Sequence, residues 1–530
     1  MAFARQYVAD KDIKKELGIV DRINKNAVED IFSDRLNNKL YVKDFGAKGD
    51  GIKNDSSAIK KAITVLRRSP RGTTLVFEND KTYYISSGEY AIDLKDLEQV
   101  AIQGNNCTIL VKPIMSLCRI DNCKDLEING INFDYKTRPY AVGELVNVFD
   151  DGLIRIKTDR SLNIRGTYNQ PVPDYFGLID RPDSRYHVGI TSYKVINRNH
   201  LLYDVKCNNF FADRDKRIDM LKSDKYRFIV PMPLVGQVIE NAICIENNRN
   251  ILMKDCNVRC AAKYMFNIKY NCGFLYFENV NVEPDPKDED MPIVGWRDAF
   301  YCENNRSAII WDKCKVKCLC DDIIHISSTA LKLKNINDDV FSLFWENEKT
   351  PLNEACVGDE IVFFNPGTGE FLGKSNIKTL EEYDDHIDVR LDQEIEGIQD
   401  YVDCEAEIRD LASPGSIIKN CDFHGTFRIN SPLYAAKSKL HVTRMWINNK
   451  KEYKDSISNN ILFSNCIINF DDNEDKYIHI DSNNINWKKA QNPYCSGNVI
   501  FYNCSVKKEA VQIGEIENEK SIVSFMKCYS

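Results

Sequence analysis

Three aspartates in the segment 296–327 have a spacing that could bring their carboxyl groups together. Asp298 is followed 23 residues later by the adjacent pair Asp321 and Asp322. Crowded carboxyl groups raise one another's proton affinity, so one can stay protonated as an acid while another is ionised as a base. Cleavage of a glycosidic bond needs that division of labour. The aspartates therefore predict a site that cleaves glycosides, if the fold places them side by side.

A recurring octet supplies the repeat that such a fold needs. Each copy has alternating apolar residues, then a polar turn and a small apolar residue, which is typical of one short strand and the bend after it. Copies occur as LEINGINF (126–133), ILMKDCNV (251–258), LYFENVNV (275–282), IIWDKCKV (309–316), SIIKNCDF (416–423), ILFSNCII (461–468) and VIFYNCSV (499–506), with VSFMKC (523–528) near the C-terminus. The repeat predicts a coil of stacked short strands.

One position of the octet is held mostly by cysteine. Stacked turns place equivalent side chains about 4.8 Å apart, so these residues would form an interior ladder: Ile131, Cys256, Val280, Cys314, Cys421, Cys466, Cys504 and Cys528. Reduced, buried thiols then account for much of the total of 19 cysteines. A metal site is less favoured, since Cys318 and Cys320 lack a partner at zinc-finger spacing.

The shortest step in this ladder is 24 residues, close to the interval between Asp298 and Asp321. Equivalent strands would therefore hold these two carboxylates about 5 Å apart along the stack. Successive residues of a flat strand point to opposite faces, so a bend or bulge is expected if Asp321 and Asp322 share one face. The alternative is that the pair marks a solvated turn.

The segment YVKDFGAKGDGIKNDSSAIKKAI (41–63) indicates where the coil starts. Its glycines permit tight turns, and Asn54-Asp55-Ser56 is a suitable N-cap for a helix that would bury Ala58, Ile59, Ala62 and Ile63. It has no phosphate-binding glycine pattern. The segment resembles the opening of the pectate-lyase-like superfamily, and this resemblance implies an all-β, right-handed parallel β-helix.

The coil is interrupted twice by alternating strands without the octet, which predicts two inserted β-barrel-like domains. The predicted organisation is an N-terminal helical cap (1–40), β-helix (41–134), a first insertion (135–235), β-helix with the active site (236–328), a second insertion (329–412) and β-helix (413–530). The cap would cover the unpaired edge of the first turn.

The central motif resembles glycoside hydrolase family 110, the exo-acting α-1,3-galactosidases. The similarity covers Asp298-Ala-Phe, then Cys314-Lys-Val, then Asp321-Asp322 with Ile-Ile-His325-Ile-Ser327, and the strand GDEIVFF (358–364) in the second insertion. It implies an inverting mechanism on a terminal sugar, α-1,3-linked galactose, with three catalytic aspartates. The family has Asn and His where this chain has His325 and Ser327, residues that would orient sugar hydroxyls.

The same resemblance implies a glutamate from the second insertion. Glu354 is nearest the expected spacing and Glu360 is second, although both could equally be solvated residues of a barrel. Further candidates for substrate binding are Trp296, as a stacking face, and Arg297. Arg428 lies after the second insertion and could reach the site from the next turn.

Two weaker patterns favour other reactions. His424-Gly425 is faintly similar to the His-Gly of polygalacturonases but lacks their Arg-x-Lys. Lys263, beside Tyr264, could be the base of a polysaccharide lyase, but no calcium-type acidic cluster accompanies it. A lyase or epimerase of uronic acids, and a non-catalytic glycan-binding β-helix such as a tailspike or adhesin, are therefore the alternatives.

Composition excludes other classes of partner. Basic and acidic residues number 71 and 79, which does not suggest a surface for nucleic acid. No run approaches the roughly 18 apolar residues of a membrane span, and the N-terminus lacks the apolar core of a signal peptide. We expect a soluble protein of intracellular or phage origin that binds an oligosaccharide or polysaccharide without cofactor or metal; a secreted form without its leader would look the same. The oligomeric state is open.

Overall fold

The computed structural model describes most of the chain in enough detail to place its strands. The described residues are 28, 30–32, 38–112, 115–149, 153–162, 170–171, 176–181, 184–208, 227–231, 241–288, 291–337, 339–345, 355–365, 371–398, 404–447, 461–470, 478–480, 498–513 and 522–529. Of the predicted N-terminal cap, Val28 and residues 30–32 are helical, and residues 1–27 lie outside the described ranges. No helix among the described residues is long and apolar enough to cross a membrane.

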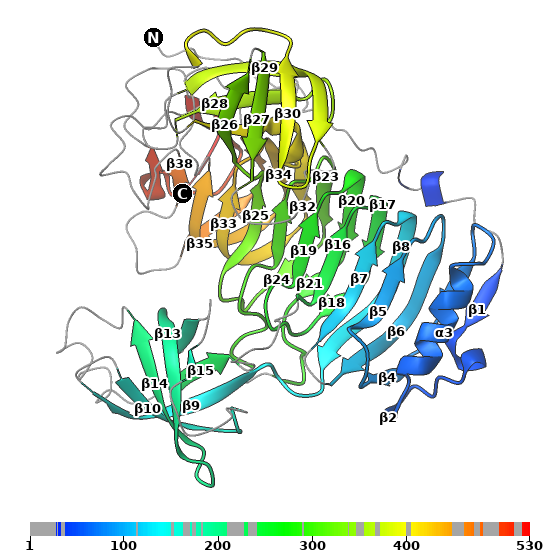
Figure 1. The fold of residues 1–530 in the computed structure, drawn as a ribbon. Coiled ribbons are helices and arrows are strands. Elements are labelled where there is room, and N and C mark those ends of the chain that lie inside the picture. The colour runs from blue at the N-terminus through cyan, green and yellow to red at the C-terminus, as the bar shows by residue number, and fades with distance from the viewer. Residues whose placement is uncertain are drawn as a thin grey trace.

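Parallel strands stack into a long coil that runs through the whole molecule (Figure 1). Their pairings form three columns, which are the three faces of a parallel β-helix. Face 1 contains β1 (Lys39–Tyr41), β3 (Thr74–Val76), β6 (Ala101–Val111), β8 (Lys124–Tyr135), β17 (Arg249–Lys254), β20 (Cys272–Glu278), β23 (Ala308–Asp312), β32 (Ser416–Lys419), β34 (Leu433–Ala436), β36 (Ile461–Ser464), β39 (Asn498–Tyr502) and β41 (Ile522–Met526).

Faces 2 and 3 complete each turn. Face 2 contains β2 (Asp50–Asn54), β4 (Thr82–Ile85), the ends of β6 and β8, β18 (Asn257–Val258), β21 (Asn281–Val282), β24 (Lys315–Val316), β33 (Asp422–Ile429), β35 (Lys439–Ile447) and β37 (Ile467–Phe470). Face 3 contains β5 (Tyr90–Lys95), β7 (Ser116–Asp121), β16 (Ile243–Glu246), β19 (Phe266–Lys269), β22 (Phe300–Glu303), β25 (Asp322–Ser327), the second halves of β33 and β35, β38 (Ile478–Ile480) and β40 (Val511–Ile513).

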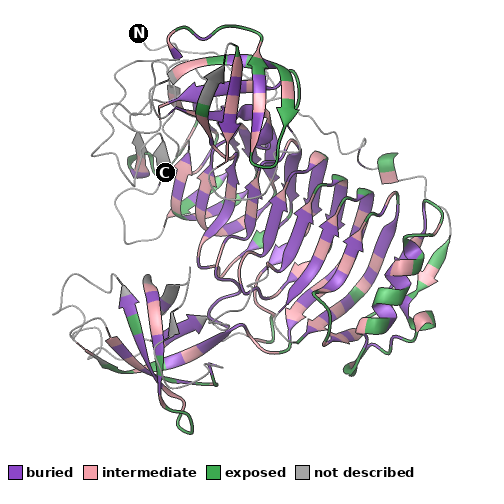
Figure 2. Cartoon of the chain, viewed as in Figure 1, coloured by how far each residue is buried: buried purple, intermediate pink, exposed green. Residues whose placement is uncertain are grey.

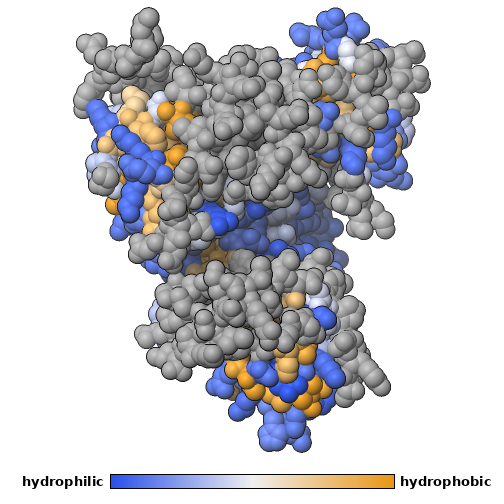
Figure 3. All heavy atoms as spheres, turned by 90° about the vertical axis from the view of Figure 1, so that its left-hand side faces the viewer, coloured by the Kyte–Doolittle hydropathy of each residue, from blue (hydrophilic) through white to orange (hydrophobic). Residues whose placement is uncertain are grey.

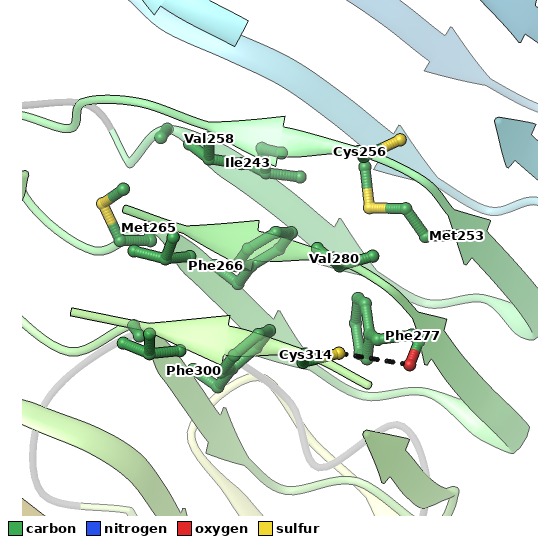
Figure 4. Close-up of a cluster of buried hydrophobic side chains, with 14 of the residues drawn as sticks. Ile243, Met253, Cys256, Val258, Met265, Phe266, Phe277, Val280, Phe300 and Cys314 are labelled. Atoms are coloured by element: carbon green, nitrogen blue, oxygen red, sulfur yellow. Dashed lines mark hydrogen bonds between the residues drawn. The ribbon is translucent and has the colours of Figure 1, made fainter. Parts of the chain in front are cut away.

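The predicted cysteine ladder lies inside the coil. Cys256, Val280 and Cys314 are completely buried and follow one another on successive turns (Figure 4). The thiol of Cys314 donates a hydrogen bond to the carbonyl oxygen of Phe277 on the turn before, at 3.3 Å. Later members repeat this bond, with Cys421 donating to Trp311. Burial raises the pKa of the Cys256 thiol to about 12, so the ladder thiols are protonated donors.

A left-handed residue precedes every later member of the ladder and makes the bend from face 1 to face 2. These residues all have φ between 48° and 58°: Asp255, Asn279, Lys313, Asn420, Asn465, Asn503 and Lys527. Asn and Asp tolerate this conformation because their short polar side chains bond locally. A second interior ladder, which the sequence analysis missed, joins Asn248, Asn271 and Asn305 at the bend after face 3, with side-chain amide bonds of 3.0 and 2.8 Å.

The opening motif folds as predicted. The helix α3 (Ser56–Leu66) buries Ala58, Ile59, Ala62 and Ile63, with its polar side turned outward (Figure 2). The carboxylate of Asp55 accepts hydrogen bonds from the backbone N–H groups of Lys48 and Gly49 and so fixes the preceding loop. Three short 3-10 helices complete the helical elements of the described residues: η1 (Val42–Phe45), η3 (Arg409–Leu411) and η4 (Lys508–Ala510).

Two antiparallel units interrupt the coil. The first is a seven-stranded sheet of β9 (Tyr140–Val148), β10 (Leu153–Thr158), β11 (Gln170–Pro171), β12 (Phe176–Arg181), β13 (Ser184–Asn197), β14 (Leu202–Asn208) and β15 (Arg227–Pro231), whose pairings return to the long strand β13. The second is a closed barrel of β26 (Leu331–Asn337), β27 (Val340–Phe344), β28 (Glu360–Phe364), β29 (Phe371–Glu382), β30 (His386–Leu391) and β31 (Glu405–Ile408). The predicted second barrel is thus present, and the first insertion is an antiparallel sheet.

Candidate active site

The register of face 3 brings Asp298 and Asp322 onto the same level of neighbouring turns. Phe300 of β22 pairs with Ile324 of β25, which is an offset of 24 residues. The backbone N–H of Ala299 donates to the carbonyl oxygen of Asp322 at 2.9 Å. The expected partner of Asp298 was Asp321, and it is wrong by one residue because the turn is 24 residues long and not 23.

One imidazole holds the two carboxyl groups together. His325 Nδ1 lies 3.2 Å from Asp298 Oδ2 and 3.9 Å from Asp322 Oδ2. Both aspartates are almost completely buried, with residues exposed by 4% and 3%. On the other side of the ring, Ser327 Oγ lies 3.4 Å from His325 Nε2. The sequence therefore predicted correctly that His325 and Ser327 lie beside the aspartates.

Burial and mutual repulsion change the proton affinity of this pair. Burial, followed by the charge of Asp321, raises the pKa of Asp298 well above its ordinary value of 3.8. Burial and then the charge of Asp298 raise the pKa of Asp322 to about 7, with Arg428 acting in the opposite direction. At neutral pH the pair therefore keeps at least one proton, which is a requirement for a general acid.

Asp321 lies just before β25 and is more exposed than the pair. Its side chain is 26% exposed and accepts a bond from Arg297 Nη1 at 3.3 Å. The backbone bends at Cys318, where φ is 58°, before the strand begins at Asp322. This bend allows consecutive aspartates to lie near one site, as the sequence analysis required.

Arg428 reaches the site from the next turn, although about one hundred residues separate it from His325 in sequence. His325 pairs with Arg428 through the main chain of β25 and β33. Arg428 Nε lies 3.1 Å from Asp322 Oδ2, and its guanidinium lies over the ring of Trp446 at 5.4 Å. The guanidinium is therefore held between an aromatic face and a carboxylate of the site.

Two predicted residues lie elsewhere. Trp296 is 1% exposed and packs in the interior of the β-helix, so its predicted role as a sugar-stacking face is wrong for this structure. Glu360 lies on barrel strand β28, where it accepts a bond from Lys374 Nζ at 3.3 Å. This ion pair assigns Glu360 to the barrel surface and not to the aspartate cluster. Glu354 lies outside the described residues.

The strands that carry the site lie between the two insertions (Figure 1). From that side, the space-filling view shows a hollow with a mainly hydrophilic surface between an upper and a lower mass (Figure 3). A polar concave surface of this kind suits a hydroxyl-rich ligand.

Comparison with known proteins agrees with this architecture. Residues 40–114 match the model of a family described as rhamnogalacturonase A/epimerase, pectate lyase-like. The fold is a pectate lyase-like β-helix. The match covers the opening motif and the first turns, which are the part of the chain whose resemblance was strongest in sequence.

More of the β-helix is distantly homologous to curated proteins. It is 21% identical over 431 residues to α-1,3-galactosidase A of Bacteroides fragilis, covering 73% of this chain and 68% of that protein. The enzyme of the same name from a second strain is 20% identical over 399 residues, covering 67% and 63%. The chain thus spans about two thirds of these relatives. The endo-xylogalacturonan hydrolase of Aspergillus tubingensis is structurally similar, with a TM-score of 0.36, 9% identity and 91% of each chain covered.

Tyr301 is a residue of the site that sequence reasoning missed. Its ring stacks on Tyr264 of the turn before, with centroids 4.5 Å apart, and meets the edge of His325 at 5.0 Å. Tyr301 pairs with His325 in the register of face 3. Alternation within FYCE (300–303), combined with that register, would have placed Tyr301 on the outer face above His325.

Proposed function

We propose that this β-helix is a glycoside hydrolase whose catalytic centre is formed by Asp298, Asp321 and Asp322. The proposal rests mainly on one observation: Asp298 and Asp322 converge on His325 Nδ1 in a buried setting that raises the pKa of both. A buried acid beside a more exposed carboxylate is what glycoside hydrolysis requires.

The geometry supports different roles for the three carboxyl groups. Asp298 is the proton donor, because its pKa is raised well above the ordinary range. It transfers a proton to the glycosidic oxygen as the bond to the anomeric carbon breaks. Asp321, which solvent reaches and Arg297 orients, removes a proton from the water that attacks that carbon. The products are a sugar with a free anomeric hydroxyl and the protonated leaving group.

Asp322 and His325 prepare the donor for this step. Asp322 lies close enough to Asp298 that both cannot easily be ionised, so its charge favours the protonated form of Asp298. His325 fixes the orientation of the Asp298 carboxyl group through Nδ1, while Ser327 contacts its other nitrogen. Arg428 limits the rise in pKa of both carboxyl groups.

The proposed substrate is a glycan with a terminal α-linked galactose, cleaved from the non-reducing end with inversion. Support comes from the distant homology to α-1,3-galactosidase A, which includes the segment of the aspartates in the sequence resemblance. Inversion needs two carboxyl groups about 6.5–9.5 Å apart. Asp298 and Asp322 are closer than that, since their ligand atoms and that of His325 lie within 4.8 Å of one another. Asp321, or Glu354 from the second insertion, must therefore provide the base.

A screen of nitrophenyl glycosides together with a terminal α-1,3-galactoside tests the proposal. We expect release of galactose, and NMR of the reaction at early times should show the β-anomer first. Release of the α-anomer would contradict inversion while leaving hydrolysis in place. Hydrolysis of a different terminal sugar would retain the mechanism and change the substrate.

Two other outcomes would overturn the proposal. An unsaturated product that absorbs in the ultraviolet, formed from a uronic acid polymer, would identify a lyase. Glycan binding without turnover, unaffected by changes to the three aspartates, would identify a binding protein.

A further inference from the structure

A second cluster of chemically competent side chains lies outside the aspartate site, on β33 and β35. It consists of Asp422, His424 and His441, whose potential ligand atoms all lie within 4.8 Å of one another. We propose that these three residues bind one divalent transition-metal ion of the zinc type. This inference goes beyond the proposed hydrolase activity and does not rest on it.

The register of the β-helix creates the cluster. Asp422 and His424 are two residues apart on β33, so their side chains point to the same, outer face. His424 pairs directly with His441 on the neighbouring strand β35. The two imidazole rings stack with their centroids 3.8 Å apart and an interplanar angle of 20°. Two turns of the coil therefore present two imidazoles beside one carboxylate.

Distances within the cluster are close to those of a metal coordination shell. Asp422 Oδ1 lies 2.9 Å from His424 Nε2 and 3.7 Å from His441 Nε2. Ligands bound tetrahedrally at about 2.0–2.1 Å are separated by roughly 3.3 Å, which lies between these two values. Small rotations of exposed side chains would equalise them, because the three side chains are each about one third exposed.

The chemistry of the ligands selects the class of metal. Two imidazoles and one carboxylate suit zinc and other first-row transition metals, whereas calcium and magnesium prefer oxygen ligands. Three protein ligands leave at least one position for water. The expected absence of metals rested on the cysteines and on the lack of a calcium-type cluster, and it did not consider histidines paired across turns.

This cluster is separate from the aspartate site, although both use β33. Residues from Asp422 to His424 belong to face 2, and those from Thr426 onward belong to face 3. Between them Gly425, at φ +145°, marks a shift of register and a change of direction. The metal would therefore bind around the bend from Arg428.

One neighbouring charge opposes the metal. Lys317 Nζ lies 3.4 Å from Asp422 Oδ2, the oxygen that the histidines do not approach. Its ammonium group competes with a cation for the same carboxylate. Replacing Lys317 by methionine should therefore strengthen metal binding, which is a result that a general loss of structure would not give.

Calorimetric titration of the chelator-treated full chain with Zn²⁺ tests the proposal. We expect one Zn²⁺ per chain, binding weakened more than about tenfold in His441→Ala and His424→Ala, and tighter binding in Lys317→Met. Visible absorption of bound Co²⁺ should report the same site. Thermal melting without metal checks that each variant is folded.

His386→Ala is the matched control. This barrel histidine lies between Asp385 and Asp388 but offers a different ring nitrogen to each, and no second imidazole is in contact. We expect it to keep the Zn²⁺ affinity of the wild type, as should Asp298→Asn. The proposal is overturned if the wild type binds no Zn²⁺, if His441→Ala and His424→Ala bind it equally well, or if Asp298→Asn alone loses it.

Discussion

Asp298 and Asp322 occupy equivalent levels on successive turns of the β-helix, and both carboxyl groups face the same nitrogen of His325. The main-chain bond between Ala299 and Asp322 sets this approach, so the backbone and not the side chains holds two acids together. Since neither can leave without breaking the stack, their repulsion is available for chemistry.

The first prediction concerns catalysis. Asp298→Asn and Asp322→Asn should each lower kcat by about 10²–10⁴, because asparagine cannot transfer the proton or maintain it on its neighbour. Steady-state kinetics on the substrate found by the screen will measure this. Asp93→Asn is the control, since Asp93 forms an ion pair with Arg119 on the same outer face several turns earlier. An undiminished rate in both site variants would eliminate the aspartates as the catalytic centre.

The second prediction concerns the pH dependence of the rate. Arg428 lowers the pKa of both Asp298 and Asp322, so its removal should raise both. If protonated Asp298 is the donor, the alkaline limb of kcat against pH should move to higher pH by about one unit in Arg428→Gln. Arg119→Gln should leave the limb in place. A shift to lower pH in Arg428→Gln would mean that Asp298 acts in its ionised form.

The third prediction concerns stability. Folded Asp298 keeps its proton at pH values where an unfolded aspartate, with a pKa near 3.8, has lost it. The free energy of unfolding of the wild type should therefore fall as the pH rises from about 4 to the folded pKa of Asp298. Asp298→Asn lacks this penalty, so its Tm should gain on that of the wild type as the pH increases. A constant difference in Tm from pH 4 to 8 would show that the carboxyl group is not strained by burial.

The fourth prediction concerns the cysteine ladder. Val280 stands between Cys256 and Cys314, so Val280→Cys should be tolerated within about 1.5 kcal/mol, since it is nearly isosteric. Val280→Asp should destabilise much more, because it would bury a charge without a partner among apolar side chains. Urea unfolding of both variants measures the difference. Equal midpoints would show that the interior tolerates polarity at this level.

The repeat could be predicted from sequence because one local feature recurs in every turn. An alternating strand, then a residue suited to the left-handed conformation, then a small buried residue can be recognised without any knowledge of neighbours. Asn279 and Asn420 show the pattern clearly, whereas Lys313 adopts the same φ against its intrinsic preference. The stack imposes the bend there, so the pattern and not the single residue carries the prediction.

The site was predicted less completely because irregular segments lie next to it. Trp296 lies outside the named strands, just before β22, where alternation cannot indicate which way a side chain points, and it turned inward. The one-residue error that paired Asp298 with Asp321 has the same origin, since the length of a turn cannot be read from residues in a bend. Arg428 was a candidate only by position, and the long insertion before it hid its pairing with His325.

That pairing has a consequence for how the protein can vary. His325 and Arg428 are neighbours through the hydrogen bonds of β25 and β33, although the whole barrel lies between them in sequence. The barrel can therefore gain, lose or exchange residues without moving either side chain. Substrate preference and catalytic geometry are thus encoded in separate stretches of the chain, and related proteins could acquire new glycan targets by changing the barrel alone.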